Sequence, residues 1–392
     1  MGNGLAKTIR HPAGRRYTPP PLLEIEGFMP RNIALPHIES LASYEPGRPI
    51  EEVARELKLR PSSIIKLASN ENALGPSPKA VAAMRRALAT AHLYPDGGGY
   101  YLRKGLAKHL GVGADNIILC AGSNELIEFL FHAFVAPGEE IVCGDRAFVI
   151  YKLCAATFQA HAVEVPFRNH THDLDAMLAA CNGRTKIIFV ANPNNPTGTR
   201  VDNATLYRFL DRVPNHTIIA LDEAYFEFLD DPPDAIRYIT VKRVPNIIVM
   251  RTFSKIVGLA GLRVGYGVTS PEMVGLLNRV RQPFNVNSIA QAGALASLGD
   301  RAHIARTRRL NKQGLAYLNG EFRKMKLEFI PSVANFICIR VGDGRAVFDA
   351  LQRRGVIVRP LAGYKMPEWI RVTVGTMPEN RRFIRELKTV MK

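Results

Sequence analysis

Seven short apolar runs limit the folds open to this chain more than any other feature of its sequence. Segments with helical patterning separate the runs, and the alternation extends from residue 117 to residue 268. Strands that alternate with helices predict an α/β fold, in which a mostly parallel central sheet carries helices on both faces. The runs are Ile117–Cys120, Ile141–Cys143, Ala162–Val165, Ile187–Val190, Ile218–Leu221, Ile247–Met250 and Val264–Val268.

The residues after this alternation predict a smaller α+β domain. A long helical stretch is expected from about residue 286 to 326, a further helix at 345–354, and another at the end of the chain. Short apolar runs between these helices predict the strands of the smaller domain. They are Phe336–Arg340, Val356–Val358 and Ile370–Val374.

The N-terminal part of the chain is expected to start irregularly and then contribute to the large domain. A short helix is expected at 50–58, and Ser77 before Pro78 predicts the start of another helix, because serine caps helices and proline suits their first turn. We therefore expect three parts. They are an N-terminal extension and arm over 1–49, a large domain over 50–285 that shares its N-terminal edge with the small domain, and a small C-terminal domain over 286–392.

A lysine follows one of the apolar runs in a setting that suits chemistry. Lys255 comes shortly after Met250, with Thr252 and Ser254 before it and Arg263 eight residues after it. In a pocket of low polarity near other cations, the pKa of a lysine falls and its neutral amine can form a Schiff base with an aldehyde. Hydroxyls and an arginine are groups that bind phosphate. An aldehyde and a phosphate on one molecule indicate pyridoxal phosphate (PLP); a surface lysine after a strand is the alternative.

Two other strand ends carry side chains that suit the same cofactor. The segment Asn192–Gly198 contains two prolines and a glycine, which predicts a rigid loop, and Asp222 and Tyr225 follow another apolar run. The carboxyl ends of strands in open α/β sheets are where ligands bind. Asp222 can pair with the pyridine nitrogen, since a protonated ring is the better electron sink. Asn195 and Tyr225 can hydrogen-bond the ring hydroxyl. A helix cap and a core aromatic are the alternative roles of Asp222 and Tyr225.

The order and spacing of these motifs resemble those of the class I/II aminotransferases, which are fold type I PLP-dependent enzymes. The motifs are Asn-Pro-x-Asn-Pro-Thr-Gly, then Asp-x-x-Tyr, then Ser-Lys with an arginine eight residues on, and the resemblance extends from about Tyr44 to the C-terminus. Within the family, the sequence is most similar to histidinol-phosphate aminotransferases. The matching stretches are Ala68–Asn72, Tyr94–Gly97, Leu259–Arg263, Pro283–Asn287 and Arg371–Thr376.

The resemblance implies a role for further residues around the cofactor. It implies that Lys255 holds PLP and then moves a proton, with Asp222 and Tyr225 as the other catalytic residues. It places the cofactor phosphate on Ser123 and Asn124, where a small-residue turn opens a helix and offers unpaired N–H groups. It places Phe148 over the pyridine ring. A helix cap is the alternative for the serine and asparagine, and a core position is the alternative for the phenylalanine.

The resemblance also implies substrate-binding residues and a homodimer. Arg371 is expected to take the anionic end of the amino donor together with Asn195, and Arg359 assists when that end is a phosphate, because guanidinium groups bind phosphate bidentately. Tyr44 is expected to reach the substrate phosphate, and Tyr94 the cofactor phosphate, each from the other subunit. A surface arginine at a strand end is the alternative for each arginine.

Composition narrows the classes of function that remain. The formal net charge of +17 fits binding of anions, but the sequence has no helix-turn-helix, RNA-binding or zinc-binding pattern, so no nucleic acid and no metal are expected. The longest apolar runs are shorter than the ~20 residues of a membrane helix, so no membrane partner is expected. Five widely spaced cysteines are typical of a reducing compartment such as the cytoplasm. The basic start of the chain is expected to be a leader, with a transit peptide as the alternative.

We therefore expect an aminotransferase that converts histidinol phosphate and 2-oxoglutarate to imidazole-acetol phosphate and glutamate. An aromatic amino-acid aminotransferase is the first alternative. A decarboxylation or cyclisation that uses the same cofactor is the second, and a basic binding protein without activity is the third. One scaffold serves many reactions, so the sequence leaves the amino donor open.

Overall fold

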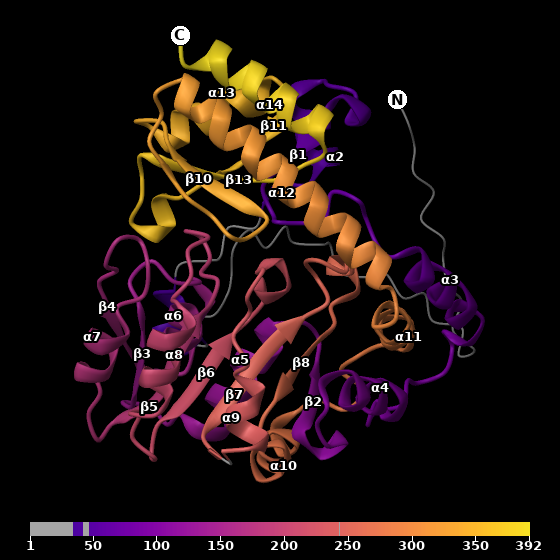
Figure 1. Cartoon of the computed structure of the whole chain (residues 1–392), viewed down its shortest axis with the longest axis vertical. Coiled ribbons are helices and arrows are strands. Elements are labelled where there is room, and N and C mark those ends of the chain that lie inside the picture. The colour runs from indigo at the N-terminus through magenta and orange to yellow at the C-terminus, as the bar shows by residue number, and fades with distance from the viewer. Residues whose placement is uncertain (1–33, 42–46, 243) are drawn as a thin grey trace, which may run out of the picture. The chain divides into compact units, whose positions relative to one another are not determined.

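The computed structural model describes residues 34–41, 47–242 and 244–392 (Figure 1). The expected leader and Tyr44 lie outside the described residues. Contacts divide the chain into a unit that ends at Ser40 and a unit from Leu41 to Lys392. The described part of the first unit contains one short helix, α1 (Pro36–Glu39). All elements described below belong to the second unit.

A seven-stranded sheet forms the centre of the second unit and confirms the predicted α/β fold. Its order is β2-β8-β7-β6-β5-β3-β4, and every strand runs in the same direction except β8, which is antiparallel to both neighbours. Each predicted apolar run forms one strand. The strands are β2 (Ile117–Cys120), β3 (Glu140–Gly144), β4 (His161–Val165), β5 (Thr185–Ala191), β6 (Ile218–Asp222), β7 (Ile247–Thr252) and β8 (Gly265–Val268).

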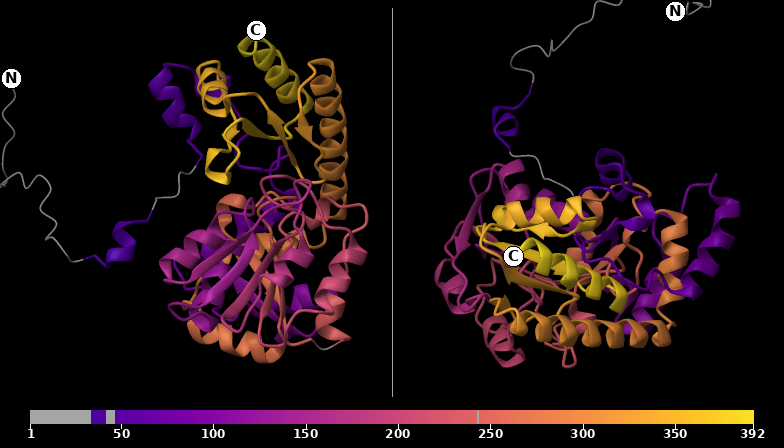
Figure 2. Two further views of the ribbon diagram at one scale, coloured as in Figure 1. Left: turned by 90° about the vertical axis from the view of Figure 1, so that its left-hand side faces the viewer. Right: turned by 90° about the horizontal axis from the view of Figure 1, so that it is seen from above.

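Helices cover both faces of this sheet, because alternate side chains of the buried strands are apolar on each face. One face packs against α5 (Ser123–Phe134), α6 (Ile150–Thr157) and α10 (Pro271–Val280) (Figure 2). The other face packs against a larger group of helices. They are α3 (Pro78–Ala87), α4 (Tyr100–Leu110), α7 (Leu174–Ala179), α8 (Asn203–Leu210), α9 (Ile236–Thr240) and α11 (Ser288–Ser297).

A second layer of structure contains both the C-terminal residues and an early part of the chain. A four-stranded antiparallel sheet has the order β12-β13-β10-β9, and β1 pairs in parallel with β11. Helix α2 shares the apolar core of this layer with the C-terminal helices (Figure 1). The elements are α2 (Ile50–Leu57), β1 (Ile65–Lys66), α12 (Arg301–Lys324), β9 (Phe329–Ile330), β10 (Phe336–Arg340), α13 (Gly344–Arg353), β11 (Val356–Ile357), β12 (Arg359–Pro360), β13 (Trp369–Thr373) and α14 (Met377–Val390).

The long helical stretch expected over about 286–326 is present, and a short break divides it into two helices. Helix α11 ends at Ser297, and α12 starts after Asp300, whose carboxylate accepts a hydrogen bond from the His303 N–H at 3.2 Å. The carboxylate also accepts the Ser77 hydroxyl at 2.6 Å, which fixes the break against α3. A capping acid that satisfies orphan N–H groups explains why the helical pattern restarts here.

Two further details concern helices of the large layer. Helix α5 starts at Ser123, so Ser123 and Asn124 belong to its first turn, and α10 was not predicted. Short 3₁₀ turns connect several of the elements. They are η1 (Pro61–Ser63), η2 (Leu88–Thr90), η3 (Ala114–Asn116), η4 (Phe226–Phe228), η5 (Ala260–Leu262) and η6 (Ala362–Tyr364).

Three neighbouring parallel strands bring the sequence motifs to one edge of the sheet. Strand β6 lies between β5 and β7, and all three run in the same direction. The loop Asn192–Gly198 follows β5, Asp222 ends β6 and Lys255 follows β7. Segments about 30 residues apart in the sequence therefore converge at the carboxyl ends of the strands, where open sheets bind ligands.

Candidate active site

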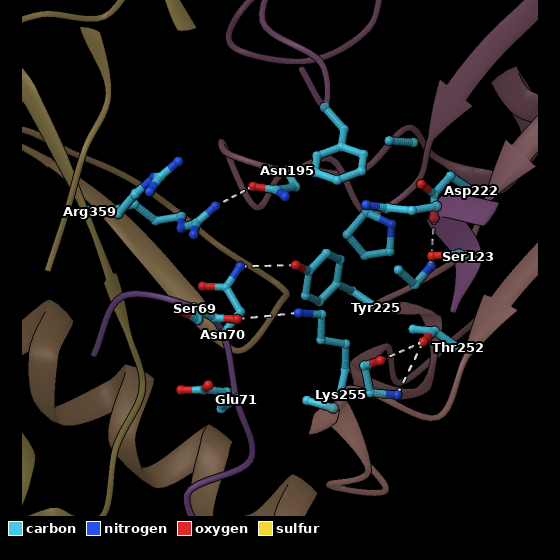
Figure 3. A pocket seen from close by; sticks show the side chains of 18 of the residues that line it. Ser69, Asn70, Glu71, Ser123, Asn195, Asp222, Tyr225, Thr252, Lys255 and Arg359 are labelled. Carbon is cyan, nitrogen blue, oxygen red and sulfur yellow. Dashed lines mark hydrogen bonds between the residues drawn. The ribbon is translucent and has the colours of Figure 1, made fainter. Parts of the chain in front are cut away.

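A cavity of about 270 Å³ lies at this edge and collects nearly all of the predicted site residues (Figure 3). Its wall is polar, and the C-terminal sheet and the segment 68–71 close one side of it. The predicted residues that line it are Ser123, Asn124, Phe148, Asn195, Asp222, Tyr225, Thr252, Ser254, Lys255, Arg263, Arg359 and Arg371.

One predicted site residue lies outside this cavity. Tyr94 is 83% exposed, and its ring stacks on that of Phe284 at 4.8 Å between centroids. Neither residue lines the cavity. Tyr94 therefore does not line the cavity of its own chain, and its expected role is one toward a second chain. Tyr44 has the same expected role toward a second chain and lies outside the described residues.

The amine of Lys255 lies between the two walls of the cavity. Its Nζ donates to the Ser69 carbonyl at 3.3 Å and lies 5.6 Å from the centre of the Tyr225 ring. Burial, together with the positive charges of Arg371 and Arg263, lowers the pKa of Lys255 from 10.5 to about 8. The neutral amine is the nucleophilic form, and the lowered pKa increases its share near neutral pH.

Asp222 is a buried carboxylate aimed into the same cavity. Its Oδ2 accepts the Tyr151 hydroxyl at 2.7 Å, and its Oδ1 accepts the Ala224 N–H at 3.1 Å. Burial raises the pKa of Asp222, although both hydrogen bonds and the charge of Lys255 oppose that effect. A carboxylate held in this way gains most from a ligand that offers it a cationic N–H.

The start of α5 forms a cradle for an anion. Gly122 has a φ of +83°, and a Cβ added there would lie 2.2 Å from Nη2 of Arg263, so the backbone and the guanidinium meet closely. Ser123 and Asn124 supply the first N–H groups of the helix, and these groups, together with the positive end of the helix dipole, can bind an anion. The Thr252 hydroxyl donates to that of Ser254 at 2.9 Å on the same side. These groups fit a phosphate.

Two arginines form the opposite wall. Arg359 and Arg371 are partners across the antiparallel pair β12–β13, so their side chains extend from the same face of the sheet. One Arg371 amine donates to Oδ1 of Asn195 and the other donates to the Ala68 carbonyl at 2.8 Å. Arg371 lies in the middle of β13 and is buried, so the alternative of a surface arginine at a strand end does not hold for it. The pair can bind an anion at the end of the cavity remote from α5.

Two buried partners of the predicted residues were missed in the sequence. Tyr151 holds Asp222, and Asn70 donates to the Tyr225 hydroxyl at 2.9 Å. Tyr151 lies on α6, three residues after Phe148, and the two rings meet edge to face at 5.7 Å. The run Ala68–Asn72 matched relatives, which was the available signal for Asn70. No spacing rule pointed to either hydrogen bond.

These groups define a class of enzyme before any relative is considered. A lysine of lowered pKa, a buried carboxylate and a phosphate cradle meet at the carboxyl edge of an α/β sheet. The chain belongs to the aminotransferase class I and II family, whose pattern it matches over residues 62–387. It is therefore an enzyme that transfers amino groups, and the expected fold type I architecture is confirmed.

The proteins of this family to which the chain is similar include histidinol-phosphate aminotransferases. The protein of that name from Akkermansia muciniphila is 47% identical over 94% of this chain and 100% of its own length. Histidinol-phosphate aminotransferase 2 from Pseudomonas fluorescens (strain Pf0-1) is 48% identical over 92% of this chain and 97% of its own length. The crystal structure of the Sinorhizobium meliloti enzyme in complex with pyridoxal-5'-phosphate has a TM-score of 0.84 at 27% identity. The similarity covers 92% of this chain and 98% of that one.

Proposed function

We propose that the protein is a PLP-dependent histidinol-phosphate aminotransferase of histidine biosynthesis. It moves the amino group of histidinol phosphate to 2-oxoglutarate, which yields imidazole-acetol phosphate and glutamate. The observation that carries the proposal is the pair Arg359 and Arg371 on facing strands, opposite the cradle at the start of α5. One anion site suits the phosphate of a cofactor, and the other suits the phosphate of an amino donor.

The residues of the cavity fit PLP. Its phosphate would be held by the start of α5 at Ser123 and Asn124, by the hydroxyls of Thr252 and Ser254, and by Arg263. Gly122 lets Arg263 approach this site, because a Cβ at that position would collide with the guanidinium group. Asp222 would pair with the ring nitrogen, and Asn195 and Tyr225 with the ring hydroxyl. Phe148 would cover the ring, and an aromatic stack adds ~1 kcal/mol beyond area burial. When bound, PLP supplies an aldehyde that combines with amines and a ring that accepts electrons.

Lys255 has two roles in this proposal. Its neutral amine would hold the cofactor through the aldehyde, a role that the lowered pKa of about 8 favours. Its Nζ would also act as the base that takes a proton from the donor carbon and as the acid that gives the proton back. An amine with a pKa near neutrality suits both directions of that transfer.

Arg263→Ala is expected to weaken PLP binding by roughly 1.5–3 kcal/mol, the range for a hydrogen bond to a charged group. The arginine faces the cradle, and its Nη2 lies 3.5 Å from the Ala121 carbonyl. Titration of the cofactor-free enzyme with PLP measures the dissociation constant. Tyr94→Phe should weaken binding less, and only if a second chain brings Tyr94 to the cofactor phosphate. Unchanged dissociation constants in both variants would place the phosphate elsewhere.

We also propose that the active enzyme is a homodimer located in the cytoplasm. In a dimer, Tyr44 and Tyr94 of one chain would reach the phosphates bound by the other. Exposed apolar side chains near Tyr94, among them Leu93, Tyr100, Tyr101 and Phe284, suit burial against another copy. All five cysteines are free thiols, which fits a reducing compartment.

Arg359→Leu is expected to raise KM for histidinol phosphate much more than KM for phenylalanine or tyrosine. A carboxylate needs one guanidinium, whereas a phosphate carries nearly two charges at neutral pH and uses both. The loss of one charge-assisted contact corresponds to roughly a 10- to 100-fold rise in KM. Steady-state kinetics with the three donors measure it. Equal effects on all three donors would favour the alternative of an aromatic amino-acid aminotransferase.

A further inference from the structure

Asn70 connects the cavity to the C-terminal sheet through its side chain. It is 1% exposed and has a φ of +55°. Its Nδ2 donates to the Tyr225 hydroxyl at 2.9 Å, and Figure 3 shows the two side chains pointing toward one another. On the other side, its backbone N–H donates to Thr373 Oγ1 at 2.9 Å, and the Thr373 hydroxyl donates to Asn70 Oδ1 at 3.1 Å.

Thr373 determines which way the Asn70 amide points. Its hydroxyl oxygen already accepts the backbone N–H of Asn70, so its own proton goes to Oδ1. The reversed amide would present a second donor to this oxygen and deprive the hydroxyl proton of its acceptor. Thr373 is buried, and an unpaired buried donor costs about 1–3 kcal/mol. The amide therefore keeps its NH₂ group toward Tyr225.

This orientation assigns the direction of the hydrogen bond at Tyr225. The hydroxyl of Tyr225 accepts from Asn70, so its own proton stays available for an acceptor in the cavity that it lines. Burial raises the pKa of Tyr225, while the charge of Arg371 and the bond from Asn70 oppose the rise. Lys255 faces the ring of Tyr225, and Asp222 adds a negative charge nearby. The group that meets a ligand is thus a protonated phenol.

The segment 68–71, which contains Asn70, also contacts Arg371, the arginine that would bind the donor. Arg371 and Thr373 are two residues apart on β13, so their side chains lie on one face of the strand. Arg371 donates to the Ala68 carbonyl at 2.8 Å, and Asn335 donates to the Asn70 carbonyl at 3.0 Å. The segment 68–71 therefore contacts both Arg371, which would bind the donor, and Tyr225, which would contact the cofactor.

We propose that Asn70 is a positioning residue that keeps Tyr225 as a hydrogen-bond donor toward the cofactor, with its amide oriented by Thr373. The inference rests on the proposed function, because it assumes that PLP occupies the cavity. It predicts that Asn70 acts on the cofactor through the Tyr225 hydroxyl. If Asn70 only stabilised the fold, its loss would weaken PLP binding equally with and without the Tyr225 hydroxyl.

A double-mutant cycle on PLP binding tests this. The cofactor-free forms of the wild type, Asn70→Gly, Tyr225→Phe and the double variant are titrated with PLP. Glycine adopts a φ of +55° without strain, so Asn70→Gly removes the amide and not the turn. We expect each single change to weaken binding roughly two- to tenfold, the range for one neutral hydrogen bond. The double variant should bind PLP as Tyr225→Phe does.

Two further variants separate positioning from packing. Asn70→Asp keeps the shape of the side chain but cannot donate, so Tyr225 would donate to it and PLP binding should fall at least as far as in Asn70→Gly. Asn335→Ala removes a hydrogen bond to the same backbone and serves as the matched control. It should lower the thermal midpoint of the cofactor-free enzyme and leave PLP binding within about twofold of the wild type.

The possible results are distinguishable. If the fold-changes in the PLP dissociation constant caused by Asn70→Gly and Tyr225→Phe multiply in the double variant, the inference is overturned and the proposed function stands. The same holds if Asn335→Ala weakens PLP binding as much as Asn70→Gly does. Failure of the wild-type protein to bind PLP would overturn both.

Discussion

Lys255→Ala is expected to abolish amino transfer and leave the fold intact. Lys255 is the only lysine among the described residues that line the cavity, and its lowered pKa makes it both nucleophile and base. A positioned acid or base alone contributes about 10²–10⁴-fold, so turnover should fall by at least that factor. Turnover with histidinol phosphate and 2-oxoglutarate measures the loss, and borohydride treatment reports whether the cofactor is still attached.

Lys152→Ala is the matched control for this variant. Lys152 lies on α6, where its Nζ pairs with Glu164 at 3.0 Å, and it does not line the cavity. Removing a partly exposed ion pair costs ~0–1 kcal/mol of stability and should leave turnover unchanged. A Lys255→Ala protein that still forms a borohydride-reducible adduct at wild-type yield would show that another amine holds the cofactor.

Asp222→Asn should retain PLP but lose activity by roughly 10²- to 10³-fold, the cost of removing one electrostatic partner from a reaction. Asparagine keeps one of the two oxygens, which can still accept the Ala224 N–H, and its NH₂ group can donate to the Tyr151 hydroxyl, so the geometry of the site survives. A neutral amide cannot hold the ring nitrogen protonated, which weakens the ring as an electron acceptor. Single-turnover rates with a donor, together with a PLP titration, separate this effect from lost binding.

Asp145→Asn provides the comparison for a carboxylate at a neighbouring strand end. Asp145 follows β3 and accepts the Phe167 N–H at 3.1 Å, a bond that an asparagine oxygen can also accept, and it does not line the cavity. Its activity should stay near that of the wild type. Near-normal turnover in Asp222→Asn would remove Asp222 from the role assigned to it.

The parts of the site that could be predicted from sequence depend on one rule of topology. Parallel strands end at the same edge of a sheet, so residues that follow successive apolar runs are brought together. Asn195, Asp222 and Lys255 follow β5, β6 and β7, which are neighbours, and all three line one cavity. The antiparallel strand β8 does not disturb this, because it joins the sheet beyond β7.

The parts that could not be predicted depend on contacts between distant segments. Asn70 meets Tyr225 and Thr373 across separations of 155 and 303 residues, and no local pattern encodes such a contact. Tyr151 is a buried aromatic residue on α6, and the apolar pattern of this helix predicts core packing rather than a hydrogen bond to Asp222. The place of Arg371 directly opposite Arg359 depends on the register of β12 and β13.

The amino donor is tested most directly by kcat/KM of the wild-type enzyme for histidinol phosphate, phenylalanine and tyrosine, with 2-oxoglutarate as the common acceptor. Two arginines at one end of the cavity should favour the phosphorylated donor. We expect kcat/KM for histidinol phosphate to exceed the other two by roughly 10- to 100-fold, the value of one added charge-assisted contact. Values for phenylalanine or tyrosine far above that for histidinol phosphate would contradict the proposed function.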